Sequence, residues 1–414
     1  MIRFHNMKTN NNIPQGYKNS PLGIIPQEWE VKKLGDVAES FSGGTPKAGN
    51  NEYYGGNIPF IRSGEIHQKN TALFLSELGL AESSAKIVEK GDLLIALYGA
   101  NSGDSAISQI NGAINQAILC IRPYNLLTSF LCSFLELKKN MYVAKYLQGG
   151  QGNLSGDIVN NYIIPIPPLP EQQKIAEVLG TWDKAIEKQT QLIEKLELRK
   201  KGLMQQLFTA KRRLSGFSTT WEVCVMQQLF TPITVVNDGK PHLPMTISAK
   251  LGLISQQNKF DKVIAGDSLK KYTLIQYGDF AYNKGNSNLY EMGCIYQLKE
   301  KSALVPFVYI CFRAKESVCG DFYQQYFLNH GLDRQLKRII TSGARGDGLL
   351  NVDKKDFFSL KVIYPSLEEQ TAIAQVLTAS DHEIKLAQQK LDLFCQQKRG
   401  LMQQLLTGKK RIKY

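Results

Sequence analysis

The chain has 414 residues, of which 43% are hydrophobic and 9% aromatic, and its formal net charge is +13 at pH 7. This length exceeds one typical domain, so we expect two or more hydrophobic cores. No apolar run is long enough to cross a bilayer and the N-terminus lacks the apolar segment of a signal peptide, so we expect a cytoplasmic protein. The positive charge favours a polyanionic partner, nucleic acid before a membrane surface.

The positive charge is distributed unevenly along the chain. The net charge is about +1 for residues 1–170 and about +4 for each of residues 171–214, 215–368 and 369–414. The basic surplus therefore lies in two helical segments and in the second globular region. If the first globular region binds a polyanion, its small net charge alone cannot account for the binding, and specific contacts are required.

Residues 25–168 and 215–366 each have the pattern of a globular domain. Both begin with Trp-Glu-Val, contain a Gly-Asp that opens an apolar run, and end in a Gly-rich stretch followed by β-rich residues and proline. Short β-branched and aromatic runs alternate with Gly, Asn and Ser turns, which predicts mixed α+β domains. Between these landmarks the two sequences hardly match. Residues 1–24 form a polar extension, which we expect to be poorly ordered up to about residue 20.

A helical segment follows each domain, and the two segments are copies of each other. Residues 169–213 and 367–411 align without a gap at an offset of 198, with 20 identical residues in 45 positions. The densest match is K-x-G-L-M-Q-Q-L-x-T, which begins at Lys200 and at Lys398. Ala, Leu, Glu, Lys and Gln dominate both copies, so each predicts one long helix, over 169–214 and 367–414.

The apolar residues of both copies recur in steps of four and three, a 3.5-residue period that favours a left-handed coiled coil. The expected seam consists of Ile175, Leu179, Trp182, Ile186, Ile193, Leu196, Leu203 and Leu207 in the first copy, and Ile373, Leu377, Ile384, Leu391, Phe394, Leu401 and Leu405 in the second. Polar breaks at Gln189, Lys200 and Lys398 would fix the register. Some 37 residues give a rod of about 55 Å. The alternative is that each helix is an ordinary amphipathic helix packed on its own domain.

Motifs of known catalytic sites are absent from the sequence. There is no G-x-x-x-x-G-K-[ST] phosphate loop, no G-x-S-x-G elbow and no [NDS]-P-P-[YF] tetrapeptide of an amino-methyltransferase. Glu30-Val31-Lys32 and Glu136-Leu137-Lys138 have the E-x-K form of a nuclease, but no Pro-Asp precedes them. Five histidines and seven scattered cysteines form no metal-ligand pattern, which favours reduced cytosolic thiols and predicts no bound metal.

Polar, Gly-rich loops remain, and these are suited to approach DNA. Arg and Lys can bind guanine edges, Asn and Gln suit adenine, and glycine lets the backbone come near a phosphate. The same residues are common in turns for conformational reasons, so each loop alone is weak evidence. The candidate DNA-binding residues are Arg62, Ser63, Asn101, Ser102, Gln148, Gln151, Asn153, Asn283, Lys284, Asn286, Asn288, Ser342 and Arg345.

Taken together, these segments resemble the specificity subunit of type I restriction-modification systems. The resemblance covers about Gly23 to Arg411. It rests on GIIPQEWEVKKLGDVAESFSGGTPK near the start, PLPEQQKIAEVLGTWD and KKGLMQQLFT in the first helix, and SLEEQTAIAQVLTASD and KRGLMQQLLT in the second. The segments Thr246–Gln256 and Tyr272–Asn283 are similar to one class of target-recognition domain.

The resemblance implies two target-recognition domains, 25–168 and 215–366, each reading one half of a split, asymmetric site in double-stranded DNA. It implies that helices 169–214 and 367–414 pack as an antiparallel coiled coil with pseudo-twofold symmetry. Two modification subunits, which methylate adenine, would dock on these helices, and restriction subunits would join them. The chain itself would be non-catalytic and carry no cofactor; S-adenosylmethionine, ATP and Mg²⁺ would belong to the partner subunits.

Two alternatives to DNA recognition remain. A scaffold whose helices bring protein partners together would explain the coiled coil, but it would not explain two dissimilar loop-rich domains or the basic charge. A self-contained methyltransferase would need the cofactor loop and tetrapeptide that the sequence lacks.

Overall fold

The computed structural model describes residues 13–146, 153–257, 266–285, 289–340 and 350–412. The chain forms two compact units. Unit 1 comprises residues 1–190 with 390–414, and unit 2 comprises residues 191–389. The division passes through both long helices, so each unit contains one domain and half of each helix.

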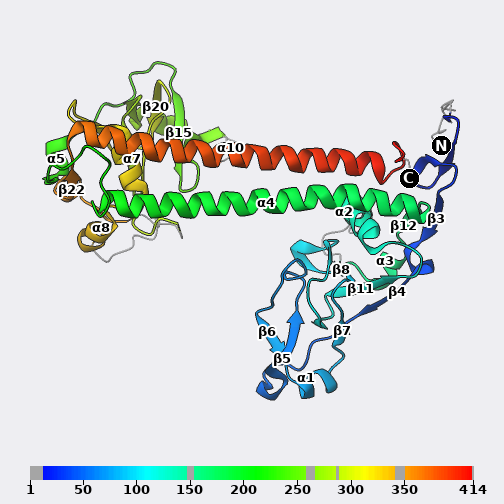
Figure 1. Cartoon of the computed structure of the whole chain (residues 1–414). Helices are drawn as coiled ribbons and strands as arrows, with labels where there is room; N and C mark the ends of the chain where they lie inside the picture. The colour runs from blue at the N-terminus through cyan, green and yellow to red at the C-terminus, as the bar shows by residue number, and fades with distance from the viewer. Residues whose placement is uncertain (1–12, 147–152, 258–265, 286–288, 341–349, 413–414) are drawn as a thin grey trace. The chain divides into compact units, whose positions relative to one another are not determined.

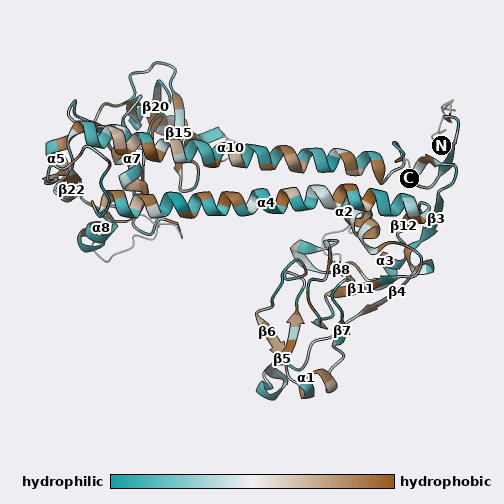
Figure 2. Cartoon of the chain, in the orientation of Figure 1, coloured by the Kyte–Doolittle hydropathy of each residue, from teal (hydrophilic) through white to brown (hydrophobic). Residues whose placement is uncertain are grey.

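The two repeated segments form the long helices α4 (Leu169–Phe208) and α10 (Leu367–Leu405) (Figure 1). None of the predicted seam residues is exposed, and Figure 2 shows apolar residues recurring along both hydrophilic helices. In unit 1, Trp182 of α4 meets Phe394 of α10 edge to face, with ring centroids 5.7 Å apart. Within unit 1, the halves of α4 and α10 therefore pack together, as expected from the matching apolar seams of the two repeated helices.

The described part of the N-terminal extension contains regular structure, so the expectation of disorder is wrong for residues 17–20, whereas residues 1–12 lie outside the described residues. Strand β1 (Tyr17–Ser20) pairs with β2 (Gly23–Pro26) in an antiparallel hairpin. The Ser20 hydroxyl closes the turn by donating to the Gly23 carbonyl and accepting from the Leu22 amide. Gly23 has φ +96°, a conformation that glycine adopts without steric cost. Short polar strands like these carry too little apolar pattern to be recognised in the sequence.

Within the described residues, the first domain contains two four-stranded sheets and three α-helices. One sheet is antiparallel and has the strand order β4 (Ala38–Ser42), β11 (Ile118–Pro123), β8 (Leu93–Ala96) and β9 (Ser105–Ile107). The other has the order β6 (Leu73–Leu75), β5 (Tyr54–Ile61), β10 (Gly112–Ile114) and β7 (Lys86–Val88), with β5 and β10 parallel. The helices are α1 (Glu77–Ala81), α2 (Thr128–Tyr146) and α3 (Gly156–Asn160).

The second domain is built in the same way. Its antiparallel sheet has the order β14 (Phe230–Ile233), β21 (Ile310–Ala314), β18 (Phe280–Asn283) and β19 (Cys294–Gln297). The other sheet has the order β16 (Gly252–Ser255), β15 (Leu243–Ser248), β20 (Ser302–Val305) and β17 (Thr273–Gln276), with β15 and β20 parallel. The helices are α5 (Met226–Leu229), α7 (Gly320–Leu328), α8 (Asp333–Ile339) and α9 (Lys354–Phe358).

The two domains therefore share one topology, although their sequences hardly match between the landmarks. Taken in chain order, β4 to β11 and β14 to β21 occupy the same places in their sheets. A two-stranded ribbon closes each domain, formed by β3 (Glu30–Lys33) with β12 (Ile163–Ile166) and by β13 (Glu222–Val225) with β22 (Lys361–Tyr364). The ribbons explain the landmarks, because each pairs the Trp-Glu-Val segment with the β-rich run before proline.

The C-terminal end of each long helix packs into the core of the domain that precedes the other long helix. Met402 and Leu405 of α10, and Leu406 directly after it, lie in the unit 1 core with residues of the first domain and of the start of α4. Met204, Leu207 and Phe208 of α4 occupy the same repeat positions in the unit 2 core. This packing explains why L-M-Q-Q-L is the densest match of the repeat. Each long helix packs on a domain and also on the other long helix. The two alternatives considered for these helices, a pair of helices packed on each other and amphipathic helices packed on a domain, are therefore combined.

Shortly after each long helix the chain passes through a residue with left-handed backbone conformation, Ala210 (φ 53°) after α4 and its repeat equivalent Gly408 (φ 70°) after α10. Replacing Ala210 with glycine is expected to raise the free energy of unfolding by about 1 kcal/mol, because this conformation strains a residue with a Cβ. Gly408→Ala is expected to destabilise, since the added Cβ would stand 2.3 Å from Cδ of Pro26. Urea unfolding of both variants checks this; a less stable Ala210→Gly protein would contradict it.

None of the helices that the structure describes is both long and apolar enough to span a membrane. No disulfide joins any of the seven cysteines, all of which lie within the described residues, and only Cys395 is exposed. Burial raises the pKa of the Cys120 and Cys132 thiols to about 12. These two cysteines are therefore neutral thiols at physiological pH.

Candidate nucleic-acid interface and its helical support

Three of the sequence-predicted loops of the first domain come together. A Cβ built on Gly64 would stand 3.7 Å from Nδ2 of Asn101, which places the loop after β5 beside the loop after β8. The Leu154 amide donates to the Leu97 carbonyl at 2.9 Å, which brings the chain at Asn153 to the same loop. Segments about 40 and 50 residues apart in sequence thus form one polar surface.

The candidate side chains of this surface differ in their freedom to reach a ligand. Asn101 and Asn153 are exposed and Ser63 is half-buried. Arg62 is exposed, but its guanidinium binds both carboxylate oxygens of Glu65, at 3.0 and 2.9 Å. Ser102 requires a correction, because it is buried and its hydroxyl donates to the Leu97 carbonyl at 3.1 Å. Ser102 therefore supports the loop from inside.

The second domain repeats this loop contact. The Leu350 amide donates to the Lys284 carbonyl at 2.9 Å, which joins the loop after β18 to the segment before α9. Asn283 and Lys284 are half-buried, and the Asn283 side chain accepts from the Gly285 amide. The candidates that lie outside the described residues are Gln148, Gln151, Asn286, Asn288, Ser342 and Arg345.

The Gly-Asp landmarks hold the sheets from which these loops extend. Asp92 binds Arg122 of β11 through two hydrogen bonds of 2.9 and 2.7 Å and accepts from the Glu89 amide. Asp279 binds Arg313 of β21 in the same way, at 2.6 and 2.8 Å, and accepts from the Gln276 amide. The sequence located the aspartates, but their arginine partners lie 30 and 34 residues away and become visible only in the structure.

Acidification is expected to weaken the first domain through Asp92. Burial is the largest single effect and opposes ionisation of this carboxyl. The hydrogen bonds from Arg122 and from the Glu89 amide, together with the positive charge of Arg122, outweigh burial and lower the pKa of Asp92 below the usual 3.8. Its stabilising contribution is therefore present above about pH 4 and is lost as the pH falls through the folded pKa. Urea unfolding between pH 3 and 7 should show a smaller pH dependence for Asp92→Asn than for the wild type and for the exposed control Asp36→Asn. An unchanged slope would contradict this.

A Trp–Glu–Arg cluster fixes the beginning of each long helix. In unit 1, the buried Glu171 accepts from the Trp29 indole at 2.9 Å and from Nε of Arg411 at 2.6 Å. In unit 2, Glu369 accepts from the Trp221 indole at 2.8 Å and from Nε and Nη2 of Arg213 at 2.6 and 2.7 Å. Each cluster joins the start of a domain, the start of one helix and the end of the other helix.

The residue after each of these glutamates attaches the domain to its helix. Gln172 accepts from the Leu127 amide, just before α2, and Gln370 accepts from the Cys319 amide, just before α7. Both glutamines are buried and donate to the carbonyl of a proline, Pro167 or Pro365. The repeated Glu-Gln dipeptide and the two Trp-Glu pairs were the sequence signal for these contacts, but the pattern did not reveal the partners.

Residues considered for catalysis have structural partners. Glu30 forms an exposed ion pair with Lys32 at 2.7 Å, and Glu136 pairs with Lys398 at 3.2 Å. His242 lies between Ser302, at 2.9 Å from Nδ1, and Asp238, at 2.9 Å from Nε2, and so connects a turn to β20. Within the described ranges, no group of three or more His, Cys, Asp or Glu side chains is arranged to hold a metal ion.

Comparison with known proteins identifies the class to which this fold and these helices belong. Residues 26–198 and 257–393 match the model of the type I restriction modification DNA specificity domain. The chain therefore belongs to the type I restriction-modification DNA specificity family, and the resemblance noted from the sequence is confirmed.

Relatives in this family match the chain over nearly its whole length or over about half of it. The MjaVIII specificity subunit of Methanocaldococcus jannaschii is 23% identical over 417 residues, covering 94% of each chain. The MjaIX specificity subunit of the same organism is 32% identical over 194 residues, 44% of this chain and 45% of that one. The crystal structure of the S subunit of a type I system from M. genitalium is 14% identical, covers 97% of this chain and 98% of its own, and has a TM-score of 0.56. This last similarity establishes the fold.

Proposed function

We propose that each domain reads one half of a bipartite, asymmetric site in double-stranded DNA. The observation that carries this proposal is the pair of domains with one topology and one set of supporting contacts, whose converging loops carry different side chains. A shared framework with different loop residues suits two readers of different short sequences. In the first domain the readers would use Arg62, Ser63, Asn101, Gln148, Gln151 and Asn153. In the second domain they would use Asn283 and Lys284 with the four remaining loop candidates.

The long helices would act as the spacer between the two readers. We infer that they pair along their length as an antiparallel coiled coil with pseudo-twofold symmetry. The order of contacts supports an antiparallel arrangement, because Glu171 lies near Arg411 and Asp183 near Lys398 in unit 1, whereas Arg213 lies near Glu369 in unit 2. A helix of 40 residues extends about 60 Å, at about 1.5 Å per residue.

The remaining parts of the proposal concern partners. Two modification subunits would dock on the helices and supply adenine methylation with S-adenosylmethionine. Restriction subunits would add ATP- and Mg²⁺-dependent cleavage. This chain would select the site in the cytoplasm, without a cofactor or a catalytic residue of its own.

Methylation-sensitive sequencing tests the proposal directly. The chain is expressed with its modification subunits in a host that lacks this system, and the genome is sequenced for methyladenine. A split motif with two defined halves and a fixed spacer is expected. Methylation without a defined motif, or only salt-sensitive and sequence-indifferent binding, would refute DNA specificity.

The helices predict a defined change in the spacer. Four residues inserted into the middle of both helices add about 6 Å, one to two base-pair steps of about 3.4 Å each. The methylated motif should then have a spacer longer by one or two base pairs with both halves unchanged. An unchanged spacer in an active complex would contradict the role of the helices.

The alternative is a scaffold that joins protein partners without reading DNA. The packing of α4 and α10 fits this function as well as the proposed one. An assembled complex that forms normally but shows no sequence preference in methylation would favour the scaffold.

A further inference from the structure

Two lysines occupy seam positions of the long helices, where apolar residues are otherwise found. The side chains of Lys200 and Lys398 are only 15% and 12% exposed. A buried ammonium group is strongly unfavourable unless it is paired with a negative charge. The sequence identified both lysines as polar breaks in the seam. Their role in the fold depends on which negatively charged side chains lie beside them.

Each lysine pairs with an aspartate of the other helix. In unit 1, Nζ of Lys398 lies 2.8 Å from Oδ1 of Asp183. In unit 2, Nζ of Lys200 lies 2.6 Å from Oδ1 of Asp381. The two aspartates occupy the same position of the repeat, as do the two lysines. This Lys–Asp pair is therefore a property of the duplicated helix and occurs once in each unit.

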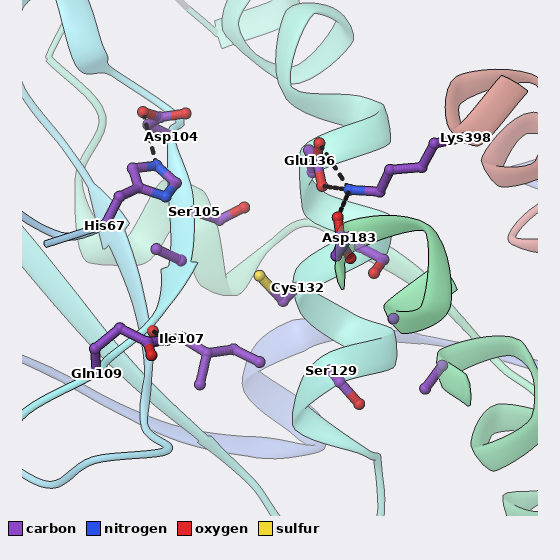
Figure 3. A pocket seen from close by; sticks show the side chains of 14 residues that line it. His67, Asp104, Ser105, Ile107, Gln109, Ser129, Cys132, Glu136, Asp183 and Lys398 are labelled. Atoms are coloured by element: carbon purple, nitrogen blue, oxygen red, sulfur yellow. Dashed lines mark hydrogen bonds and ion pairs between the residues drawn. The ribbon is translucent and has the colours of Figure 1, made fainter. Parts of the chain in front are cut away.

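A side chain from the domain of the same unit joins each Lys–Asp pair. Glu136 of α2 approaches Lys398 with its two carboxylate oxygens 3.2 and 3.5 Å from Nζ, and Figure 3 shows Glu136 and Asp183 both pointing toward Lys398. Gln325 of α7 instead donates from Nε2 to Oδ2 of Asp381 at 2.7 Å. The first domain thus contacts the ammonium group of its Lys–Asp pair, whereas the second domain contacts the carboxylate group of its pair.

The two domain helices present these residues from the same face. Both helices begin just after an amide bound by an equivalent glutamine, Leu127 before α2 and Cys319 before α7. When α2 and α7 are aligned at these two amides, Gln325 of α7 corresponds to Ser133 of α2. Ser133 precedes Glu136 by three residues. Residues three apart lie on one face of a helix. The two domains therefore reach the same Lys–Asp pair from neighbouring turns of equivalent helices.

Close apolar packing does not continue up to these contacts. In unit 1, an open pocket of ≈ 450 Å³ lies beside the pair and is lined by His67, Asp104, Cys132, Glu136, Asp183 and Lys398 among others (Figure 3). In unit 2, a pocket of ≈ 380 Å³ is lined by Gln325, Leu328 and Asp381 among others. Where packing leaves such space, a directional polar contact has more influence on how a helix lies.

We propose that the Lys–Asp pair is the point at which the long helices orient each recognition domain, and that Glu136 and Gln325 are positioning residues for target recognition. The pair offers an ammonium and a carboxylate side by side, so it accepts an acidic side chain or an amide. One duplicated helix can therefore hold two domains with different sequences. This inference rests on the proposed function, because the orientation of a domain matters only if its loops read DNA at a set spacing.

Four substitutions in the full chain, assembled with its modification subunits, test the proposal. Glu136→Lys places a second ammonium beside Lys398, whereas Glu136→Gln retains a group able to bond either member of the pair. Gln325→Leu removes the contact in unit 2. Glu177→Lys is the matched control, because Glu177 forms an exposed ion pair with Lys174 on the same α4.

Two measurements separate positioning from DNA binding. Hydrogen exchange should become faster in α2 for Glu136→Lys and in α7 for Gln325→Leu, with the other domain unchanged. Methylation is measured on duplexes that carry the motif found for the wild type, with the native spacer and with spacers one base pair shorter and longer. Preference for the native spacer should fall about five- to tenfold in both variants. Glu136→Gln and the control should keep the wild-type preference within about twofold.

Each outcome decides the proposal. It is overturned if Glu136→Lys keeps both the protection of α2 and the spacer preference, or if Glu136→Gln loses them to the same extent. If Glu136→Lys fails to fold, Glu136→Leu removes the contact without adding a charge, and the same changes are expected. If the wild type methylates no defined motif, the proposed function fails, while the exchange of α2 and α7 still decides whether the pair orients the domains.

Discussion

Replacing Leu405 with alanine, near the C-terminus, is expected to destabilise the N-terminal domain by about 2–5 kcal/mol. Leu405 is buried in the unit 1 core, together with Trp29, Phe130 and Phe134 of the first domain. Truncating a buried leucine removes apolar burial and leaves a cavity that its neighbours fill only in part. The effect should fall on a domain that lies about 240 residues away in sequence.

The measurement is urea unfolding of the full chain, combined with hydrogen exchange to identify the domain that loses protection. Exchange should increase in β11 of the first domain and remain unchanged in β21 of the second. The repeat equivalent, Leu207→Ala, should show the opposite distribution, because Leu207 lies in the unit 2 core. Leu393→Ala on the same helix is the control, since Leu393 is 56% exposed and should change stability by about 0.5 kcal/mol or less. Equal effects of Leu405→Ala on both domains would contradict the assignment.

Replacing Glu171 with alanine is expected to lower the stability of unit 1 by about 2–4 kcal/mol. The carboxylate is fully buried and accepts from both the Trp29 indole and the Arg411 guanidinium. Its removal leaves the buried indole N–H without an acceptor and deprives Arg411 of its most buried partner. Arg411 is partly exposed and also binds Glu28, so solvent and Glu28 compensate part of the loss.

Glu369→Ala provides the matched test in unit 2, where Arg213 and Trp221 lose the same contacts. Trp29 and Trp221 fluorescence can follow the two clusters during unfolding, with Trp→Phe variants to separate their signals. Glu177→Ala, which removes only an exposed ion pair, should cost about 0.5 kcal/mol or less. A Glu171→Ala protein as stable as this control would show that the cluster does not hold the helix start.

The long helices were the most predictable part of the fold. Their 3.5-residue period and their composition are local properties, so the sequence alone indicated the helix starts at Leu169 and Leu367 and a seam without exposed residues. The lysines at 200 and 398 were recognisable as interruptions of that seam. Their aspartate partners were not, because a charge pair across two helices depends on register, which the spacing within one helix does not specify.

The shared topology of the two domains was not predictable. Strands of three to five residues carry little periodicity, and pairing such as β5 with β10 joins segments about 50 residues apart. Each domain fills the same sheet positions with different apolar residues, since a core requires volume and burial more than identity. The landmarks that did match are the places where specific contacts are required: the Trp–Glu–Arg clusters, the closing ribbons and the Gly-Asp turns.

For the candidate interface, the sequence indicated which segments form loops, but it did not indicate which side chains of those loops are free to reach a ligand. Gly, Asn and Ser mark where the chain turns, but the direction of a side chain depends on its neighbours. Ser102 illustrates this, because its hydroxyl satisfies the Leu97 carbonyl inside the loop. Arg62 remains a candidate reader, but the direction of its guanidinium depends on Glu65, a partner that the sequence pattern did not reveal.

The sequence by itself determined the duplication, the two long helices and the family, because these depend on local periodicity and on segments repeated along one chain. The tertiary structure decided which parts meet: the end of each helix with the start of the other, the Gly-Asp aspartates with distant arginines, and the Lys–Asp pairs with α2 and α7. These contacts are long-range, and their free energy depends on burial and geometry that arise only when the chain is folded.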